Sequence, residues 1–513
     1  MATVRSSLTG NISEQEYKRR IRAWTMYDWA NSAFATTILA AVLPIYYSQV
    51  AGATLPSAAI ATAYWARGLS ISLFITALLS PILGTISDVM RGKKRFLSFF
   101  IGIGVLGTGL MILIKEGDWL LASILFIVGR VGFTAANVFY DALLPHVARE
   151  DDRDRVSTRG YAMGYLGGGI LLALNVVMLQ LLPGTWGARV SFLSVAIWWA
   201  IFSIPVLRRV PEPPSATEKL SPGESVVAIS FKRLWQTFKD IRQYADLFKF
   251  LLAFLIYNDG IGTIIGVAAI YGAELGFGST QMVLALLLVQ FVGIPFSLIF
   301  GRLPSRGESR RPLYLAFIIY NLIALPAAGI FGARMLPADM TSNIGVILGV
   351  IIAVEAIGLL LSFLFANRFC SGIAESMDAK RGILLALMVY AVIATWGFFL
   401  NSVIEFWFLA WMVAVVQGGS QALSRSLYAS MSPASKSGEF FGLFGIMEKF
   451  SAILGPLLFS AAVTLFNSSR PAVLSLIAFF VIGGGILTTV NVEQGRKVAR
   501  EEDAQLLQPE MSA

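Results

Sequence analysis

Fourteen apolar stretches of about 20 residues, separated by short polar connections, run from Trp24 to Val490. A helix that rises ~1.5 Å per residue needs ~20 apolar residues to cross a ~30 Å hydrocarbon layer, and each stretch meets that length. The sequence therefore predicts an all-α polytopic membrane protein with about 14 transmembrane helices. The predicted spans are residues 24–48, 58–83, 96–114, 119–144, 160–182, 188–207, 249–274, 280–301, 312–333, 344–367, 382–400, 405–427, 439–466 and 471–490.

Lys and Arg gather in alternate connections between these spans. Short cytoplasmic loops retain Lys and Arg, whereas short translocated loops do not. Both termini are therefore predicted to be cytoplasmic, in a multi-pass protein of the cell (plasma or inner) membrane. The cations on the predicted outer side are Lys115, Arg189, Arg334 and Arg470.

Composition excludes several other classes of protein. With 56% hydrophobic and 14% charged residues, the chain has too little polar surface to cover a soluble core. The net charge of +9 is spread over many short loops, which argues against a nucleic-acid partner. The chain has one cysteine, Cys370, and one histidine, His146, so no disulfide framework, Cys/His metal site or cofactor is predicted.

A long polar segment divides the chain into two bundles. Residues 1–207 form the predicted N-terminal six-helix bundle, and 249–492 the C-terminal bundle, followed by a cytoplasmic tail at 493–513. The linker 208–248 contains apolar residues at helical spacing from Phe231 to Tyr244, typical of an amphipathic helix on the membrane surface. A latch between the two bundles is the alternative.

The two bundles begin with similar strings. Tyr27-Asp28 in the first span is echoed by Tyr257-Asn258-Asp259 in the seventh. Repeated halves are usual in secondary transporters, whose substrate site lies at the repeat interface near the bilayer midplane.

Gly84 to Asp88, followed by Arg91-Gly92-Lys93-Lys94-Arg95, resembles the signature loop of the major facilitator superfamily. That loop usually has a glycine three residues after the aspartate, where this chain has Arg91. More specific strings resemble the bacterial branch of the autophagy-related vacuolar effluxer family, whose vacuolar members export amino acids. They are YDWANSAFATTI (27–38), NVFYDALLPH (137–146), GYLGGG (164–169), QFVGIP (290–295), QGGSQALSRS (417–426) and EFFGLFGIMEKFSAILGP (439–456).

The resemblance implies a two-bundle fold of twelve helices. This chain therefore has an inserted helix pair at about 304–371, and either LIFGRL (298–303) or FLFANRF (363–369) ends the helix that corresponds to the family's eighth. The resemblance also implies that Asp88 stabilises an outward-facing state through charge pairing between helices. The gate-loop candidates are Gly84, Asp88, Arg91, Lys93 and Lys94, unless these cations only fix the topology.

Seven ionisable residues lie deep inside the predicted spans. Each costs ~2.5–3.5 kcal/mol at a helix centre, so together they would cost on the order of 20 kcal/mol if they faced lipid. They must therefore face a cavity or one another, for structural pairing or for substrate and proton handling. They are Asp28, Arg67, Arg130, Asp259, Glu355, Glu448 and Lys449, and Asn31 joins the candidates beside Asp28.

Depth distinguishes these candidates. Asp259 lies ~15 Å from the cytoplasmic end of its span and is the candidate for reversible protonation, because burial favours a neutral carboxyl. Asp28, at ~7 Å, is expected to pair or cap near the inner gate. Arg67 and Arg130 are expected at a similar middle depth. Glu448 and Lys449 point about 100° apart on a helix and are expected to have different partners.

Aromatic residues and glycines have structural interpretations. Trp24, Tyr27 and Trp29 favour an interfacial belt, with cation binding beside Asp28 as the alternative. Glycines at 102–109 and 164–169 predict close helix crossings.

These features predict a secondary active transporter, not an enzyme. It would move a small solute, with amino acids as the candidate, by proton-coupled alternating access, as a monomer in the lipid bilayer. A central arginine suits a carboxylate and a central aspartate suits an ammonium group. A lysolipid, peptide or drug exporter is the alternative, and a membrane-embedded sensor or enzyme is the alternative of another class.

Overall fold

The computed structural model describes residues 12–56, 58–213, 232, 235–236, 239, 242–305, 307–451, 454–466 and 469–507. Every regular element in those ranges is a helix. Fourteen helical runs among them are long and apolar enough to cross a membrane, which confirms the predicted number. The predicted amphipathic helix at 231–244 lies largely outside the described residues.

The N-terminal half consists of α1 (Glu14–Ala33), η1 (Phe34–Ala41), α2 (Leu43–Tyr46), η2 (Tyr47–Ala51), α3 (Ala58–Val89), α4 (Lys93–Leu110), η3 (Met111–Leu113), α5 (Trp119–Ala142), α6 (Leu144–Val147), α7 (Arg153–Leu181) and α8 (Trp186–Arg209). The C-terminal half consists of α10 (Ala245–Glu274), α11 (Ser279–Arg302), α12 (Arg311–Met335), α13 (Ala338–Thr341), α14 (Ile344–Phe369), α15 (Ser371–Glu375), α16 (Ala379–Phe399), α17 (Val403–Met431), η4 (Ala434–Lys436), α18 (Ser437–Phe450), α19 (Leu454–Phe466), α20 (Ser469–Ser475), α21 (Ile477–Thr488) and α22 (Val492–Leu507).

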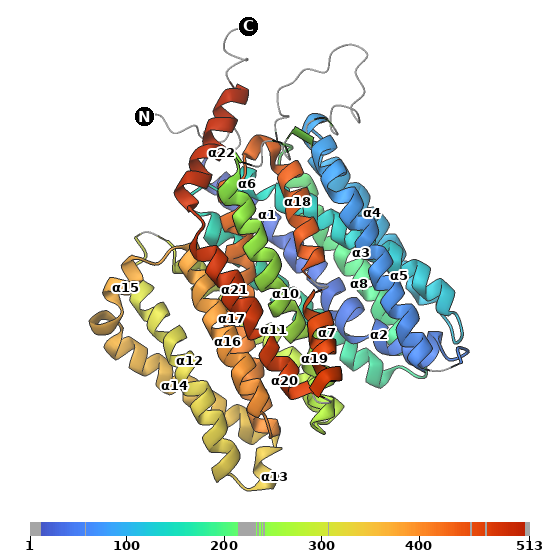
Figure 1. The fold of residues 1–513 in the computed structure, drawn as a ribbon. Helices are drawn as coiled ribbons and strands as arrows, with labels where there is room; N and C mark the ends of the chain where they lie inside the picture. Colours follow the sequence, from blue (N-terminus) through green and yellow to red (C-terminus); the bar gives the residue numbers. More distant parts are fainter. Residues whose placement is uncertain are drawn as a thin grey trace.

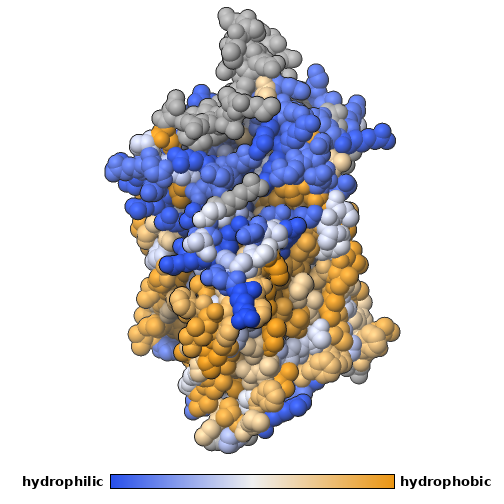
Figure 2. Space-filling view, turned by 90° about the vertical axis from the view of Figure 1, so that its left-hand side faces the viewer, coloured by the Kyte–Doolittle hydropathy of each residue, from blue (hydrophilic) through white to orange (hydrophobic). Residues whose placement is uncertain are grey.

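The two halves meet mainly along three pairs of helices. Helix α3 packs along α18, and α7 packs along both α11 and α17. The start of α1 and helix α22 lie at the same end of the bundle, the top of Figure 1. We call this the termini end and the opposite one the far end. On the face that Figure 2 shows, hydrophilic residues cover the termini end and a broad hydrophobic region lies below it, as expected for a membrane-embedded surface.

The inserted pair is α12 and α14, at the edge of the bundle on the left of Figure 1. These two helices pack on each other, and α12 also packs on α17. Helix α11 makes the long contact with α7 of the N-terminal half. This contact favours LIFGRL at the end of α11, rather than FLFANRF, as the end of the helix in the eighth position of the twelve-helix plan.

Two predicted spans are interrupted. The span predicted at 439–466 consists of two helices, α18 and α19, and that at 471–490 consists of α20 and α21. The first span changes from α-helix to π-helix at Phe34–Ala41, where the Val42 N–H donates to the carbonyl of Thr37 at 2.8 Å. Such wide turns concentrate at functional sites. Breaks of this kind are invisible to hydropathy, because the residues on both sides are apolar.

Close helix crossings occur at both predicted glycine runs. A Cβ at Gly107 would lie 2.8 Å from the backbone nitrogen of Gly129, and one at Gly168 would lie 2.9 Å from Thr36 Cγ2. The first crossing brings α4 onto α5, and the second brings α7 onto the first span. The packing role predicted for these glycines is confirmed.

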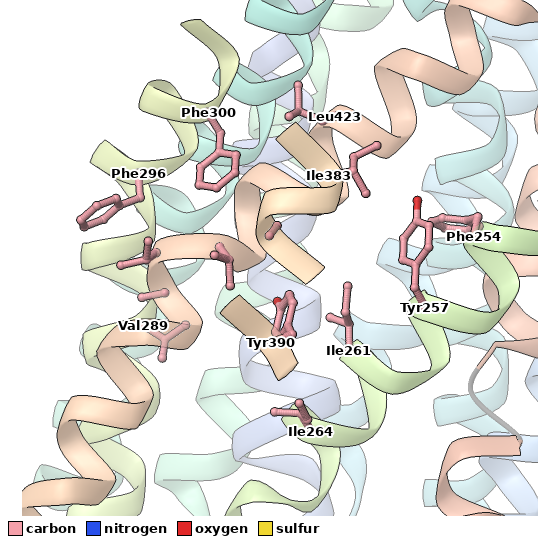
Figure 3. Close-up of a cluster of buried hydrophobic side chains, with 14 of the residues drawn as sticks. Phe254, Tyr257, Ile261, Ile264, Val289, Phe296, Phe300, Ile383, Tyr390 and Leu423 are labelled. Carbon is pink, nitrogen blue, oxygen red and sulfur yellow. The ribbon is translucent and has the colours of Figure 1, made fainter. Parts of the chain in front are cut away.

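Part of the apolar core lies inside the C-terminal half (Figure 3). Side chains from α10, α11, α16 and α17 meet there, and Tyr257 and Tyr390 are the large polar-tipped members. The Tyr257 hydroxyl lies 2.6 Å from Ser424 Oγ on α17. This core fixes α10, and therefore Asn258 and Asp259, against α17.

Candidate functional site

Arg425 of α17 crosses from the C-terminal half into the N-terminal half. Its Nη1 lies 3.0 Å from Asp141 Oδ1 on α5, and its Nη2 lies 3.3 Å from Asp28 Oδ2 on α1. The arginine side chain is 4% exposed. One guanidinium thus joins two carboxylates that come from different helices of the opposite half.

Neutral groups complete the environment of this guanidinium. Arg425 Nε and Nη2 donate to the hydroxyl and the carbonyl of Ser157, each at 2.9 Å. The rings of Trp24 and Tyr161 lie 4.9 and 4.6 Å from its Cζ. The Tyr140 hydroxyl donates to Asp28 Oδ2 at 2.7 Å. We call Arg425, Asp28, Asp141 and Tyr140 the charge cluster.

The sequence around the charge cluster explains how the groups come so close. A Cβ at position 160 would collide with the carboxylate of Asp28 and lie 2.9 Å from Arg425 Nη2, so glycine is required there. The cluster holds two carboxylates and one guanidinium. Buried charges are costly unless they are paired, so the two halves are held together here as long as the pairs persist.

The signature loop forms a second polar connection between the halves, after the charge cluster. Asp88 accepts hydrogen bonds from the backbone N–H groups of Gly438 at 3.0 Å and Glu439 at 2.8 Å, in the first turn of α18. Lys93 forms an ion pair with Asp88, and both side chains are almost fully buried. A carboxylate at a helix N-terminus satisfies free N–H groups and is favoured by the helix dipole. Gly84 makes room, because a Cβ there would collide with the carbonyl of Gly438.

Arg91 adopts the backbone conformation that suits glycine. Its φ is +51°, whereas that of Gly92 is −130°. The left-handed residue of this turn is thus at position 91, where the family usually has glycine. The loop still forms its turn, and Arg91 adopts the strained left-handed backbone conformation. Lys94 is half-buried, and its N–H donates to Glu212 Oε2 at 2.9 Å.

Helix α22 makes a third polar connection, at the termini end. Asp503 accepts the N–H groups of Ala434 at 3.0 Å and Ser435 at 2.9 Å, in the connection that leads into α18. Arg500 reaches Glu150 of the N-terminal half at 2.5 Å. The charge cluster, the signature loop and α22 all connect the halves at the termini end. The bundle is therefore closed there.

Asp259 lies elsewhere, beside the break between α18 and α19. It is 1% exposed, and neither carboxylate oxygen has a hydrogen-bond partner in the described part of the chain. Its nearest polar neighbours are the N–H groups of Leu454 and Gly455 and the hydroxyl of Thr263, none of which meets hydrogen-bond geometry. The neighbouring Asn258 donates to Ser451 Oγ at 2.7 Å.

Arg130 lies on the face of α5 that is directed at the other helices of the site. Residues 130, 137 and 141 are 7 and 4 positions apart in sequence, so they share one helix face. Asn137 on that face accepts a hydrogen bond from Asn31 at 2.6 Å. Arg130 itself forms no ion pair among the described residues, and its guanidinium lies 5.9 Å from the ring of Phe126.

Three expectations from the sequence are wrong. Glu448 and Lys449 pair with each other at 2.6 Å, because long adjacent side chains can bend together across the 100° that separates them. Arg67 is exposed and lies about one turn nearer the far end than Arg130, since a Cβ at Gly68 would contact the Phe126 ring at 3.4 Å. Trp24 is fully buried rather than interfacial, because it packs on Arg425.

Comparison with known proteins finds relatives for almost the whole chain. The family model described as "Vacuole effluxer Atg22 like" matches residues 59–346 and 327–500. The chain belongs to this family. An uncharacterized MFS-type transporter of Bacillus subtilis (strain 168), YxiO, is 35% identical over 95% of this chain and 99% of its own length. The autophagy-related protein 22 of Yarrowia lipolytica is 26% identical over 84% of this chain and 76% of its own length.

Solved structures share the fold of this vacuole effluxer-like chain. The proton:xylose symporter XylE superposes with a TM-score of 0.58 at 13% identity, covering 96% of this chain and 99% of the symporter. A bacterial homologue of the iron transporter ferroportin in an outward-facing state gives 0.56 at 11% identity, covering 92% and 98%. The protein is a membrane transporter of the major facilitator superfamily, and its relatives confirm that it is not an enzyme.

Within this effluxer-like fold, Arg425 and Asp141 are the charged site residues that the sequence analysis missed, and Tyr140 is a neutral one. Arg425 and Asp141 lie within four positions of a predicted span end, residues 427 and 144, and are therefore not among the ionisable residues deep inside the spans. The helices run on to Met431 and, through α6, to Val147. If the predicted helices had been extended a few residues beyond the apolar stretches, both charged residues would have been counted as lying inside them.

Proposed function

We propose that the protein moves a small solute carrying a carboxylate, with amino acids as the leading class, by proton-coupled alternating access. The observation that carries this proposal is the charge cluster. It closes one end of the bundle through groups that can separate only if the two halves move apart. In this proposal the closed end is cytoplasmic, so the described state is outward-facing. The protein works as a monomer in the cell membrane, with both termini in the cytoplasm.

The proposed roles follow from charges without partners. Arg130 is a cation in the membrane-spanning part of the N-terminal half that forms no ion pair among the described residues, and it suits the carboxylate of the solute. Asp259 is a buried carboxylate in the C-terminal half without a hydrogen bond there, and it suits a coupling proton. Asn31 is hydrogen-bonded to Asn137 on the helix of Arg130, and Glu448 and Lys449 lie on α18, which packs on α5 and α10; these three are second-line candidates.

Transport into proteoliposomes tests this proposal. A pH gradient should drive uptake of a radiolabelled amino acid identified by a ligand-stabilisation screen. Asp259→Asn should abolish the pH-driven accumulation but spare counterflow exchange, because the amide cannot release a proton. Asp246→Asn, at the start of the same helix where the carboxylate is 14% exposed, is the matched control and should transport normally.

Other outcomes decide against the proposal. Full pH-driven accumulation by the Asp259→Asn protein removes Asp259 as the coupling site, and Glu448 becomes the next carboxylate to test. Stabilisation by lysolipids, peptides or drugs instead of amino acids favours an exporter of those compounds. Arg130→Gln should weaken binding of carboxylate ligands at least tenfold, and unchanged binding excludes the assigned role.

A further inference from the structure

The inserted pair meets α17 through a polar contact near the middle of the membrane. Glu355 is eleven residues into α14, a helix of 26 residues. Gly358 allows the ring of Tyr320 on α12 to approach α14, and the Tyr320 hydroxyl donates to the carbonyl of Val354 at 2.8 Å. The pair is therefore tightly joined at the height of Glu355.

Three buried polar atoms come together at this contact. Asn321 of α12 donates through Nδ2 to the carbonyl of Phe317 at 2.9 Å and to Glu355 Oε2 at 3.4 Å. The indole of Trp411 on α17 lies beside the same carboxyl group. Asn321 Oδ1, Glu355 Oε1 and Trp411 Nε1 are all buried without a hydrogen-bond partner in the described chain. Asn321 is 1% exposed, so bulk solvent does not reach its side chain.

The hydrogen-bonding capacity of the three atoms indicates which ligand could bind between them. Trp411 offers one N–H donor, Asn321 Oδ1 offers an acceptor, and Glu355 offers an O–H donor at Oε1 when it is protonated, because its Oε2 accepts from Asn321. One water molecule matches this set, since it can accept two hydrogen bonds and donate one. A metal cation does not match, because Ca²⁺ and Mg²⁺ require about six oxygen ligands and an N–H group would point at the ion.

The groups that face Glu355 in the described chain favour its neutral, protonated form. The groups that face it are Asn321 and Tyr320 from α12 and Trp411 from α17, and none of these is a cation. The nearest cations on the packed helices are Arg311, Arg334 and Arg368, at the helix ends and roughly 15–20 Å away along the helix axes. An ionised carboxylate without a partner is costly in the hydrocarbon layer.

We propose that Glu355, Asn321 and Trp411 form a proton-and-water site, in which a protonated Glu355 and one bound water hold the inserted pair against α17. The site is separate from Asp259 and from the charge cluster. Its member Trp411 lies on α17, the helix that also carries Arg425, so loss of the proton would loosen the inserted pair from that helix.

Infrared difference spectroscopy of the whole protein tests this site. The wild type at neutral pH should show a protonated-carboxyl C=O band that disappears in Glu355→Gln and persists in Glu375→Gln, an exposed control on α15. Trp411→Phe removes the N–H donor and should shift the band. A sharp O–H stretch that responds to H₂¹⁸O should be present in the wild type and absent from Asn321→Leu.

Stability measurements supply the second test. Glu355→Gln should keep the melting temperature of the wild type at neutral pH, because the amide is neutral and of the same shape. The wild type should lose stability at alkaline pH more steeply than Glu355→Gln. Absence of the assigned C=O band in the wild type overturns the proposal, as does an identical alkaline profile for the two proteins. If a variant does not fold, the spectrum of the wild type in H₂O and D₂O still decides whether a buried protonated carboxyl exists.

Discussion

Arg425 is one side chain that fixes the relation between the two halves. Its guanidinium has a planar set of donors, and it uses them on two carboxylates and on Ser157 from one buried position. A lysine would carry the same charge but could not reach all these acceptors at once.

We expect Arg425→Ala to destabilise the protein by about 3–5 kcal/mol, because it leaves two buried carboxylates without a cation. Thermal or denaturant unfolding in detergent measures this change. Arg155→Ala is the control, since Arg155 is 51% exposed and lies 3.9 Å from Asp152, and it should change stability by less than about 1 kcal/mol. Adding Asp28→Asn and Asp141→Asn to Arg425→Ala should restore part of the loss. Equal stability of the two arginine variants would falsify the role of the charge cluster.

Arg91 gives a prediction of the opposite sign. A left-handed conformation costs a non-glycine residue about 1–2 kcal/mol, so Arg91→Gly should raise the free energy of unfolding by about 1 kcal/mol. Gly92→Ala should be close to neutral, because a Cβ there makes ordinary contacts with Phe96 at 3.5 Å. A less stable Arg91→Gly protein would mean that the arginine side chain contributes more than the turn costs.

The site was only partly predictable at the residue scale. Asp28, Asp259 and Glu355 could be selected from sequence, because an ionisable group inside an apolar run has few physical explanations. Their partners could not be selected, because Asp28 and Arg425 are 397 positions apart in sequence. Pairing is a property of helix packing, which hydropathy does not contain.

At the scale of the element, Asp88 controls the start of α18. Its carboxylate occupies the helix N-terminus, an interaction worth about 0.3–2 kcal/mol. We expect Asp88→Asn to shift the bundle toward opening at the termini end by about 2- to 30-fold. A cysteine at buried Ala422, in a protein lacking Cys370, should then react faster with a thiol reagent. Asp246→Asn is the control, and unchanged reactivity in Asp88→Asn would exclude this role for the cap.

The inserted pair gives a second prediction at this scale. The Arg311 guanidinium donates to the carbonyls of both Leu303 and Met377, at 2.7 and 2.6 Å, so the chain enters and leaves the pair at neighbouring points. Deleting about residues 304–371 should therefore leave a membrane-inserted protein whose carboxyl terminus stays on its original side. A reporter fused to that terminus measures its side, and a switch of side would show that α12 and α14 do not both cross.

Helix number was predictable because each span must be long and apolar in its own right. The breaks in α18–α19 and α20–α21 and the π-helical turns of η1 were not, since they depend on packing partners rather than on local hydropathy. The same dependence decided that α11, not α14, contacts α7.

For the whole molecule, the loop charges predict an orientation that chemical labelling can test. In a protein lacking Cys370, a cysteine at position 337, in the connection after α12, should react with an impermeant reagent applied outside. Cysteines at positions 222 and 505 should react only after the membrane is permeabilised. External labelling at 222 or 505 would reverse the assigned orientation, and with it the identification of the closed end as cytoplasmic.

The charge cluster also sets an order of events during synthesis. Asp141 and Arg425 are 284 positions apart, so at roughly 5–20 residues per second the ribosome needs on the order of 15–60 s to supply the arginine after the aspartate. From the time α8 is complete until Arg425 is made, all six helices of the N-terminal half have been synthesised while Asp28 and Asp141 still lack their cation. A nascent N-terminal half must therefore hold these two carboxyls hydrated or protonated, and its helices cannot reach their final packing until the tenth span of the twelve-helix plan has been inserted.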